Sequence, residues 1–269
     1  MLTGAVQAQD KSQYTLFNPT PADKMRDFST DRPTKSNVPY TVDAGHFQYE
    51  GDLFIYSFNN TTTPDADITK WVIGNPTFKL GLLNNVDFEV NFAAYTTARG
   101  TLRSTGASAG VSGFGDAFTR FKVNLFGNDG GAAALALIPY AKWPTASWGV
   151  GNGYVESGLI APLAVSLPMG FSSILMAEFD YLKNSANGGY HANFPALINV
   201  SRQIVPGLTG YAEIYADWST DAGASSVYTL DFALAWVPKP NLQFDIGINI
   251  GLVPAAVPYQ IYAGISKRF

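Results

Sequence analysis

The chain ends with the stretch Tyr259-Gln260-Ile261-Tyr262-Ala263-Gly264-Ile265-Ser266-Lys267-Arg268-Phe269. Apolar side chains recur here at every second position (259, 261, 263 and 265), which is the period of a half-buried β-strand. A soluble domain seldom leaves its last strand so apolar and its last side chain aromatic, whereas transmembrane barrels close on such a strand, with an aromatic residue at the interface. The stretch therefore predicts a β-barrel in a bacterial outer membrane.

The composition limits the alternatives. The chain has 269 residues, of which 46% are hydrophobic and only 14% are charged, whereas about a quarter of the residues of soluble proteins are charged. Every apolar stretch is cut by Gly, Pro, Asn or a charged residue before it reaches the roughly 18 residues that a membrane-spanning helix needs. Strands, not helices, are therefore expected to face the lipid.

Several classes of site lack their residues or motifs. There is no Cys, which excludes disulfides, zinc–thiolate sites and thiol nucleophiles. The net charge of -4 includes no basic block, so nothing favours nucleic-acid binding. Phosphate loops, metal clusters and nucleotide fingerprints are also missing from the sequence. We expect no cofactor, no bound metal and no nucleic-acid partner.

Alternation with period 2 recurs along the chain. Residues 45–58, for example, place Gln48, Glu50 and Asp52 on one face and Phe47, Tyr49, Leu53 and Ile55 on the other. Tight turns such as Asn84-Asn85 alternate with long polar loops such as residues 98–113. The pattern predicts about twelve strands of roughly 11 to 14 residues, enough to cross a bilayer at a tilt.

These strands predict an all-β fold, an up-and-down antiparallel transmembrane barrel over residues 44–269. An even number of strands returns both termini to one side, and tight turns are periplasmic in such barrels, so both termini are expected in the periplasm. The alternative is a soluble sandwich or lipocalin-like barrel with its apolar face inside. The low charge content disfavours that fold, because its outer surface would lack charged side chains.

The polar face of the strands is rich in carboxylates. An acidic, water-filled bore would favour cations; alternatively, the charges pair across a narrow interior. The charged residues expected to line the lumen are Glu50, Asp52, Asp87, Glu89, Asp116, Arg120, Lys122, Glu156, Glu178, Asp180, Glu213, Asp231 and Asp245. Aromatic side chains expected to face inward are Phe118, Tyr140, Trp71, Tyr95, Tyr211, Tyr215 and Tyr262, and an irregularity near residues 73–76 leaves the face of Trp71 open.

The N-terminal part shows no strand pattern. Residues 1–8 end in Val6-Gln7-Ala8, which matches the small-x-small site of a secretory signal whose basic leader is missing. Residues 9–43 are polar and contain four prolines. They form either a disordered periplasmic tail or a plug inside the barrel, and in the second case Asp31 and Arg32 would anchor the plug to lumen charges.

Four short motifs resemble one family of outer-membrane transporters, the family of the MetA pathway of phenol degradation. They are Thr30-Asp31-Arg32-Pro33, Ala44-Gly45-His46-Phe47-Gln48-Tyr49-Glu50, Gly113-Phe114-Gly115-Asp116 and Lys142-Trp143-Pro144-Thr145. The resemblance spans about residue 28 to Phe269, although Trp143 stands where we expect an aliphatic residue. It implies a channel for aromatic or other small hydrophobic compounds.

Three functions follow as hypotheses. The first is an outer-membrane channel through which a small-molecule solute diffuses passively, with membrane lipid around it and with Phe269 and its strand contacting the barrel-assembly machinery. The second is a structural or partner-binding barrel with a closed lumen. The third, which is the least favoured, is an outer-membrane lipid-modifying enzyme. An enzyme would need a nucleophile beside a base, but the two histidines, His46 and His191, are expected at opposite ends, so no enzymatic activity is predicted. The oligomeric state is left open.

Overall fold

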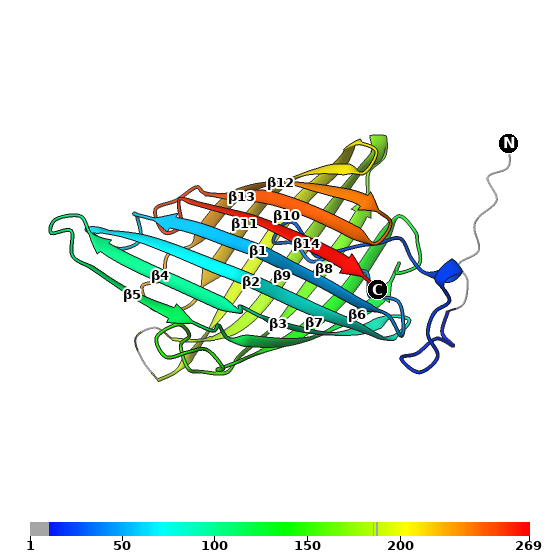
Figure 1. The fold of residues 1–269 in the computed structure, drawn as a ribbon, viewed down its shortest axis with the longest axis horizontal. Helices are drawn as coiled ribbons and strands as arrows, with labels where there is room; N and C mark the ends of the chain where they lie inside the picture. Colours follow the sequence, from blue (N-terminus) through cyan, green and yellow to red (C-terminus); the bar gives the residue numbers. More distant parts are fainter. Residues whose placement is uncertain (1–10, 185, 187) are drawn as a thin grey trace.

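The strands of the computed structural model, which describes residues 11–184, 186 and 188–269, form one closed antiparallel sheet. Residues 1–8, with the predicted signal remnant, lie outside the described residues. β1 (Phe47–Asn59) pairs with β14 (Tyr259–Arg268) on one side and with β2 (Ala66–Leu83) on the other. The sheet therefore closes on itself as a barrel (Figure 1).

Fourteen strand segments make up a wall of twelve strands. β3 (Val86–Phe92) and β4 (Tyr95–Leu102) both pair with β2 and follow one another as two halves of one long strand. β5 (Ser108–Gly113) pairs with β4, and β6 (Ala117–Phe126) pairs with β3. These two segments are therefore the two halves of the next long strand. The predicted twelve-stranded antiparallel barrel is confirmed. Its other strands are β7 (Ala133–Trp143), β8 (Glu156–Ser166), β9 (Phe171–Lys183), β10 (Tyr190–Val205), β11 (Leu208–Ser219), β12 (Val227–Lys239) and β13 (Leu242–Gly251).

Short and long connections gather at opposite ends of the barrel. The short ones join β2 to β3, β6 to β7, β8 to β9, β10 to β11 and β12 to β13, and they lie beside the end of β14. We call this the turn end, and we call the opposite end, which carries the longest connections, such as residues 144–155, the loop end. Two 3₁₀ turns, η1 (Ala22–Lys24) and η2 (Pro168–Gly170), are the described helical elements. None of the described helices is long and apolar enough to span a membrane.

The predicted loop at residues 98–113 is wrong in most of its length. β4 and β5 continue as a paired hairpin, from Thr96 opposite Gly113 to Thr101 opposite Ser108, and it projects beyond the barrel at the loop end (Figure 1). The loop was predicted because this stretch is rich in Gly and Ser. β-Branched residues such as Thr96, Thr101 and Val111 nevertheless favour extended backbone. Only the turn between β4 and β5 is irregular.

The alternation changes phase once in β1 and β2. Asp52 faces Asn75 and the next pair is Phe54 with Ile73, so Leu53 and Gly74 are passed over. Gly74 has a φ of 67°, a conformation that favours glycine. This confirms the irregularity expected near residues 73–76.

The phase change corrects the expectations for Ile55 and Tyr95 and decides the face of Trp71. Ile55 turns into the barrel, where it lines a cavity with Lys70 and Lys142, although it was expected outside. Trp71, whose face was left open, lies on the outer face against Tyr56, with ring centroids 4.6 Å apart. Tyr95, paired with the exposed Ile73, also faces outward.

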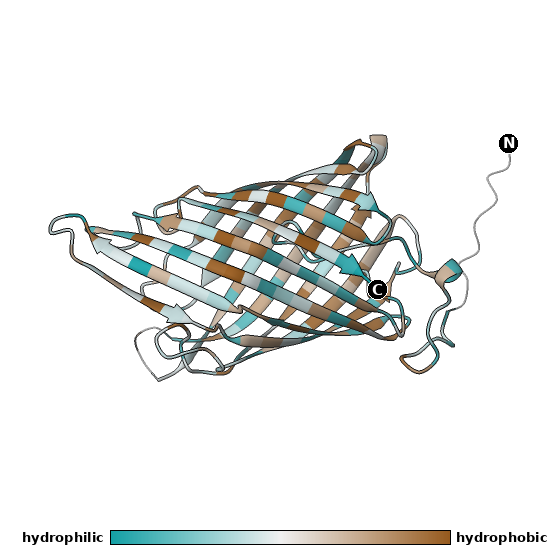
Figure 2. Cartoon of the chain, viewed as in Figure 1, coloured by the Kyte–Doolittle hydropathy of each residue, from teal (hydrophilic) through white to brown (hydrophobic). Residues whose placement is uncertain are grey.

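The outer face is apolar. Figure 2 shows brown apolar residues alternating with paler and teal ones along each strand. The exposed members include Ile198, Ile214, Phe232, Leu234 and Ile246, and the exposed Trp218 and Trp236 lie near opposite ends of the barrel. This arrangement matches a lipid-facing band with aromatic residues at both interfaces.

A charge on this face tests its contact with lipid. Ile246, in the middle of β13, is 57% exposed, so we expect Ile246→Arg to lower the free energy of unfolding in lipid vesicles by about 2–4 kcal/mol. Urea titration in phosphatidylcholine vesicles, followed by tryptophan fluorescence, measures the loss. The matched control is Ile204→Arg, near the turn end of β10, which should cost about 0–1 kcal/mol. Equal losses would contradict a lipid-facing position for Ile246.

Candidate functional site in the barrel lumen

The N-terminal segment attaches to the turn end before it enters the barrel. Leu16 N donates to Leu82 O over 2.8 Å, and Thr15 forms a β-bridge with Leu83. Farther on, Thr20 N donates to Ala44 O over 3.0 Å. Residues 27–44 then run into the lumen and return to β1, as their contacts with inward side chains show. We call residues 27–44 the plug segment.

Asp31 is bound by two lysines of the wall. Its carboxylate lies 2.8 and 2.9 Å from Lys122 Nζ and also pairs with Lys79. Within the plug segment, Val38 N donates to Asp31 Oδ1 over 2.7 Å, while Asp31 N donates to Glu50 Oε2 over 2.9 Å. Burial opposes ionisation of Asp31, but the nearby charges of Lys122 and Lys79 outweigh it, and the pKa of Asp31 lies well below its usual value.

Wall carboxylates complete this cluster. Lys79 Nζ lies 2.7 Å from Glu50 Oε1, and Lys122 Nζ lies 3.4 Å from Glu89 Oε1. Asp87 accepts a hydrogen bond of 2.9 Å from Val42 N of the plug segment. All these wall side chains are buried. Four predicted lumen residues, Glu50, Asp87, Glu89 and Lys122, are thus brought together around Asp31.

Arg32 lies between two other predicted lumen carboxylates. Its Nη1 is 2.5 Å from Asp52 Oδ1, while its Nη2 and Nε lie 2.6 and 3.1 Å from the two oxygens of Asp245. The guanidinium carbon is 5.9 Å from the centroid of the Tyr262 ring. Such bidentate pairs are among the strongest hydrogen-bonded contacts in proteins, so Arg32 fixes the plug segment to β1 and β13.

Lys35 is a third contact, which the sequence reasoning missed. Its Nζ donates to Thr229 Oγ1 over 2.8 Å, pairs with Asp231 and lies 4.9 Å from the Tyr215 ring centroid. Glu213 accepts hydrogen bonds from Lys35 N and Ser36 N over 3.1 and 3.2 Å. A cation three residues beyond Arg32, in a segment facing an acidic lumen, was the signal available in the sequence.

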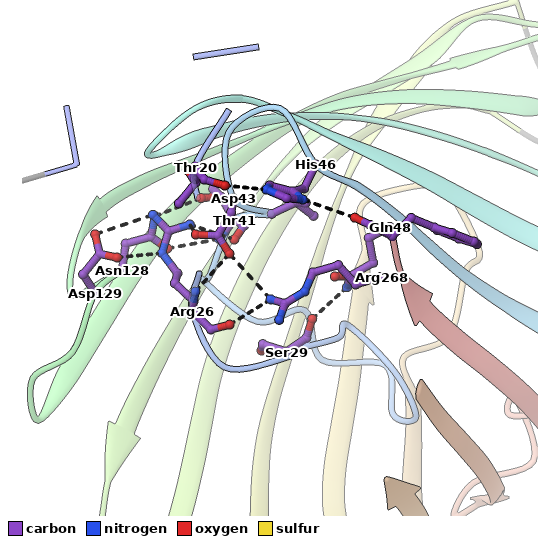
Figure 3. Close-up of polar contacts among 12 residues, drawn as sticks. Thr20, Arg26, Ser29, Thr41, Asp43, His46, Gln48, Asn128, Asp129 and Arg268 are labelled. Atoms are coloured by element: carbon purple, nitrogen blue, oxygen red, sulfur yellow. Dashed lines mark hydrogen bonds and ion pairs between the residues drawn. The ribbon is translucent and has the colours of Figure 1, made fainter. Parts of the chain in front are cut away.

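A separate polar cluster holds the segment at the turn end (Figure 3). The buried Asp43 accepts a hydrogen bond of 3.1 Å from Arg26 N and lies 3.5 Å from Arg268 Nη1. The two nitrogens of His46 lie 2.7 Å from Thr20 O and 3.2 Å from Phe269 O. Arg26 and Asp43, which the sequence reasoning also missed, therefore connect the plug segment to the last strand.

Asp129, in the turn between β6 and β7, joins the same cluster. Its Oδ1 lies 2.7 Å from Lys11 Nζ and 2.9 Å from Arg26 Nε. Burial opposes its ionisation, but hydrogen bonds from Lys11 and Asn84 and the charge of Arg26 lower its pKa. A cavity of about 1110 Å³ opens beside these residues at the turn end.

The other predicted lumen residues lie nearer the loop end. Lys142 Nζ is 3.2 Å from Asp116 Oδ2 and 2.8 Å from Glu156 Oε2. Tyr140 donates to Asp180 over 2.5 Å. Glu178 lies two positions from Asp180 on the same face of β9, and Arg120 faces inward with Lys122 on β6. The structure therefore places all thirteen predicted side chains on the inner face, in separate groups.

The inner wall also carries an apolar patch. Ile138, Ile160, Met176 and Leu197 are buried together and pack against Tyr140, Ile174 and Tyr215. Asn37 N, in the plug segment, lies 3.4 Å from Met176 S. Of the predicted inward aromatic residues, Phe118, Tyr140, Tyr211, Tyr215 and Tyr262 are half-buried or buried on inward positions. The plug segment thus reaches an apolar, tyrosine-flanked part of the lumen.

Comparison with known proteins gives the family. The model described as "Putative MetA-pathway of phenol degradation" matches residues 30–269. The chain belongs to this family. No curated protein matches the chain by sequence.

Solved structures share the fold at low sequence identity. The COG4313 outer membrane channel from Pseudomonas putida F1 is 14% identical, with 90% of this chain and 100% of that chain covered and a TM-score of 0.63. The β domain of the Bordetella autotransporter BrkA is 13% identical, with 83% and 99% covered and a TM-score of 0.54. The translocator domain of NalP from Neisseria meningitidis is 10% identical, with 83% and 88% covered and a TM-score of 0.53. The closed wall and apolar exterior are those of an outer-membrane β-barrel.

The charge of Asp31 predicts how plug docking depends on pH. Because its pKa is lowered in the folded state, its contribution is fully present above about pH 3.9, the ordinary Asp pKa, and is lost as the pH falls through the lower folded value. A nitroxide on Asn37→Cys, in this Cys-free chain, should therefore stay immobile between pH 5 and 7.

Asp31→Asn replaces this carboxylate with a neutral amide of nearly the same shape. Lys79 and Lys122 keep Glu50 and Glu89 as partners, so we expect docking to weaken by about 1.5–3 kcal/mol, the usual value for hydrogen bonds to charged groups. The nitroxide spectrum should show a mobile component already at pH 7. The control is Arg103→Gln at the loop end, which breaks an exposed 3.6 Å pair with Asp67 and should leave the spectrum unchanged. An immobile label in Asp31→Asn would refute this role of Asp31.

Proposed function

We propose that this protein is an outer-membrane channel for small molecules, and that the plug segment closes its lumen and moves when a solute passes. The observation that carries the proposal is the kind of contact that holds the plug segment. Asp31, Arg32 and Lys35 bind the wall through side-chain ion pairs, so the segment can leave without opening the sheet. The lumen also accommodates both the entering and the returning part of the segment, which sets a minimum bore.

The inner wall favours small aromatic or hydrophobic solutes. The apolar patch around Ile138 and Met176 is flanked by Tyr140 and Tyr215, and such a lining offers apolar surface together with hydroxyl groups that orient a bound molecule. A barrel of twelve strands lies between small, side-chain-filled barrels and wide aqueous porins. Passage of small solutes by diffusion through or out of the barrel fits this size.

The proposal includes an orientation and two partners. Tight turns are periplasmic in outer-membrane barrels, so we place the turn end, with Phe269 and the start of the plug segment, in the periplasm. Membrane lipid surrounds the apolar outer face. The strand that ends at Phe269 is the proposed contact with the barrel-assembly machinery.

Single-channel conductance in a planar bilayer tests the proposal. The variant Asp31→Asn/Lys35→Gln should raise the open probability at least tenfold over the native protein, because it loosens two of the three wall contacts. A variant lacking residues 9–43 should conduct steadily and favour cations, since its lumen is acidic. Arg103→Gln is the matched control.

A reversible lock gives a second readout. Asn199 Nδ2 lies 3.1 Å from Thr34 Oγ1, so the double variant Thr34→Cys/Asn199→Cys, bridged by a short thiol cross-linker that a reductant cleaves, fixes the plug segment to β10. We expect no current while the bridge is intact and restored current after reduction. Equal current in both states would refute movement of the segment. No current from any variant would favour a structural barrel with a closed lumen.

A further inference from the structure

The surroundings of Arg32 form a site fitted to a guanidinium group. Asp245 accepts two hydrogen bonds along one edge of the group, from Nη2 and Nε, and Asp52 accepts another from Nη1. Tyr262 presents its ring at 5.9 Å. We call Asp52, Asp245, Tyr262 and Gly264 the guanidinium cage.

Gly264 makes room for the group. A Cβ at this position would lie 2.2 Å from Arg32 Nη2 and 2.4 Å from Arg32 Cζ, which is far inside van der Waals contact. The wall is therefore hollowed at the one place where the flat guanidinium lies. The cage has a shape as well as a charge, and both are supplied by barrel strands.

The cage holds more negative charge than Arg32 neutralises. Two carboxylates face one cation, and the Asp245 side chain is fully buried while that of Asp52 is 9% exposed. Without Arg32, Asp52 keeps a hydrogen bond of 3.0 Å from Asn75 and Asp245 keeps one of 3.3 Å from Gln243, but neither amide carries a charge, and buried carboxylates without a counter-charge are strongly unfavourable. When the plug segment leaves, water or another cation must take the place of the guanidinium.

We propose that the guanidinium cage is a binding site for solutes that carry a guanidinium group, and that Arg32 occupies it as a tethered competitor. This inference rests on the proposed function, because it requires the plug segment to move. A tethered group competes at a high effective concentration, so free solute binds weakly until Arg32 is displaced or removed.

A second contact of the plug segment follows the same chemistry. Lys35 Nζ lies between Asp231 and Thr229, over the ring of Tyr215. Carboxylate and tyrosine thus surround both cations of the segment within the lumen. The apolar patch beside Tyr215 provides surface for the body of an aromatic cation.

Calorimetry with a matched pair of probes tests the cage directly. The probes are phenylguanidinium and its neutral isostere phenylurea, added to the full-length protein in detergent. Arg32→Gln empties the cage and should bind phenylguanidinium at least tenfold more tightly than the native protein. Phenylurea should bind neither protein measurably.

Changes in the cage should reverse this gain. Adding Gly264→Ala or Asp245→Asn to Arg32→Gln should weaken phenylguanidinium binding at least tenfold, the first by filling the cage and the second by removing a charge. Arg103→Gln, which breaks an exposed pair with Asp67 away from the plug segment, should bind as weakly as the native protein. If Arg32→Gln does not fold, Gly264→Ala alone should release Arg32 and mobilise a nitroxide at Asn37→Cys.

Each outcome decides the inference separately from the proposed function, because calorimetry does not depend on conduction. Equal affinity of Arg32→Gln for phenylguanidinium and phenylurea, or no gain over the native protein, would overturn the cage as a guanidinium site. An immobile label in Gly264→Ala would show that Arg32 does not depend on the hollow at Gly264. A conducting channel with no guanidinium binding would leave the proposed function standing and refute this inference.

Discussion

The structure depends on closure of the sheet. Inside a membrane no water is available to pair with the backbone, so every N–H and C=O group in the lipid region needs a partner within the protein. Pairing of β1 with β14 meets this requirement by removing both sheet edges. Once the ring is closed, alternation along each strand sends apolar side chains toward lipid and polar ones inward. The polar lumen is therefore a consequence of closure, and its acidic character comes from the residues at the inward positions.

That lumen explains the position of the plug segment. Carboxylates on β1, β3, β11, β12 and β13 would be costly inside a narrow barrel without cations, and the wall lysines Lys79 and Lys122 neutralise only some of them. Arg32 and Lys35 supply the missing positive charge. Asp31, between the two wall lysines, reverses this charge pattern and fixes the register of the segment within the bore.

The proposed movement of the plug segment depends on the kind of contact that holds it. Asp31, Arg32 and Lys35 pair with side chains of the wall, so breaking these pairs leaves the backbone hydrogen bonds of the sheet intact. The segment is held firmly at the turn end by Asp43 and Asp129 and reaches the apolar patch only with its inner part. A hinge near the turn end would therefore let the inner part leave while the attachment stays in place.

The sequence by itself determined the barrel, its twelve strands and the inward face of its charged residues, because period-2 alternation is a local property that closure preserves. It failed where local patterns mislead. The phase change at Leu53 and Gly74 turned Ile55 inward, against the prediction, and the Gly- and Ser-rich β4–β5 hairpin was predicted as a loop. Only the tertiary structure decided between a free tail and a segment inside the lumen. The partners of Arg32 and Lys35 lie roughly 20 to 210 residues away along the chain, and no spacing in the sequence records such contacts.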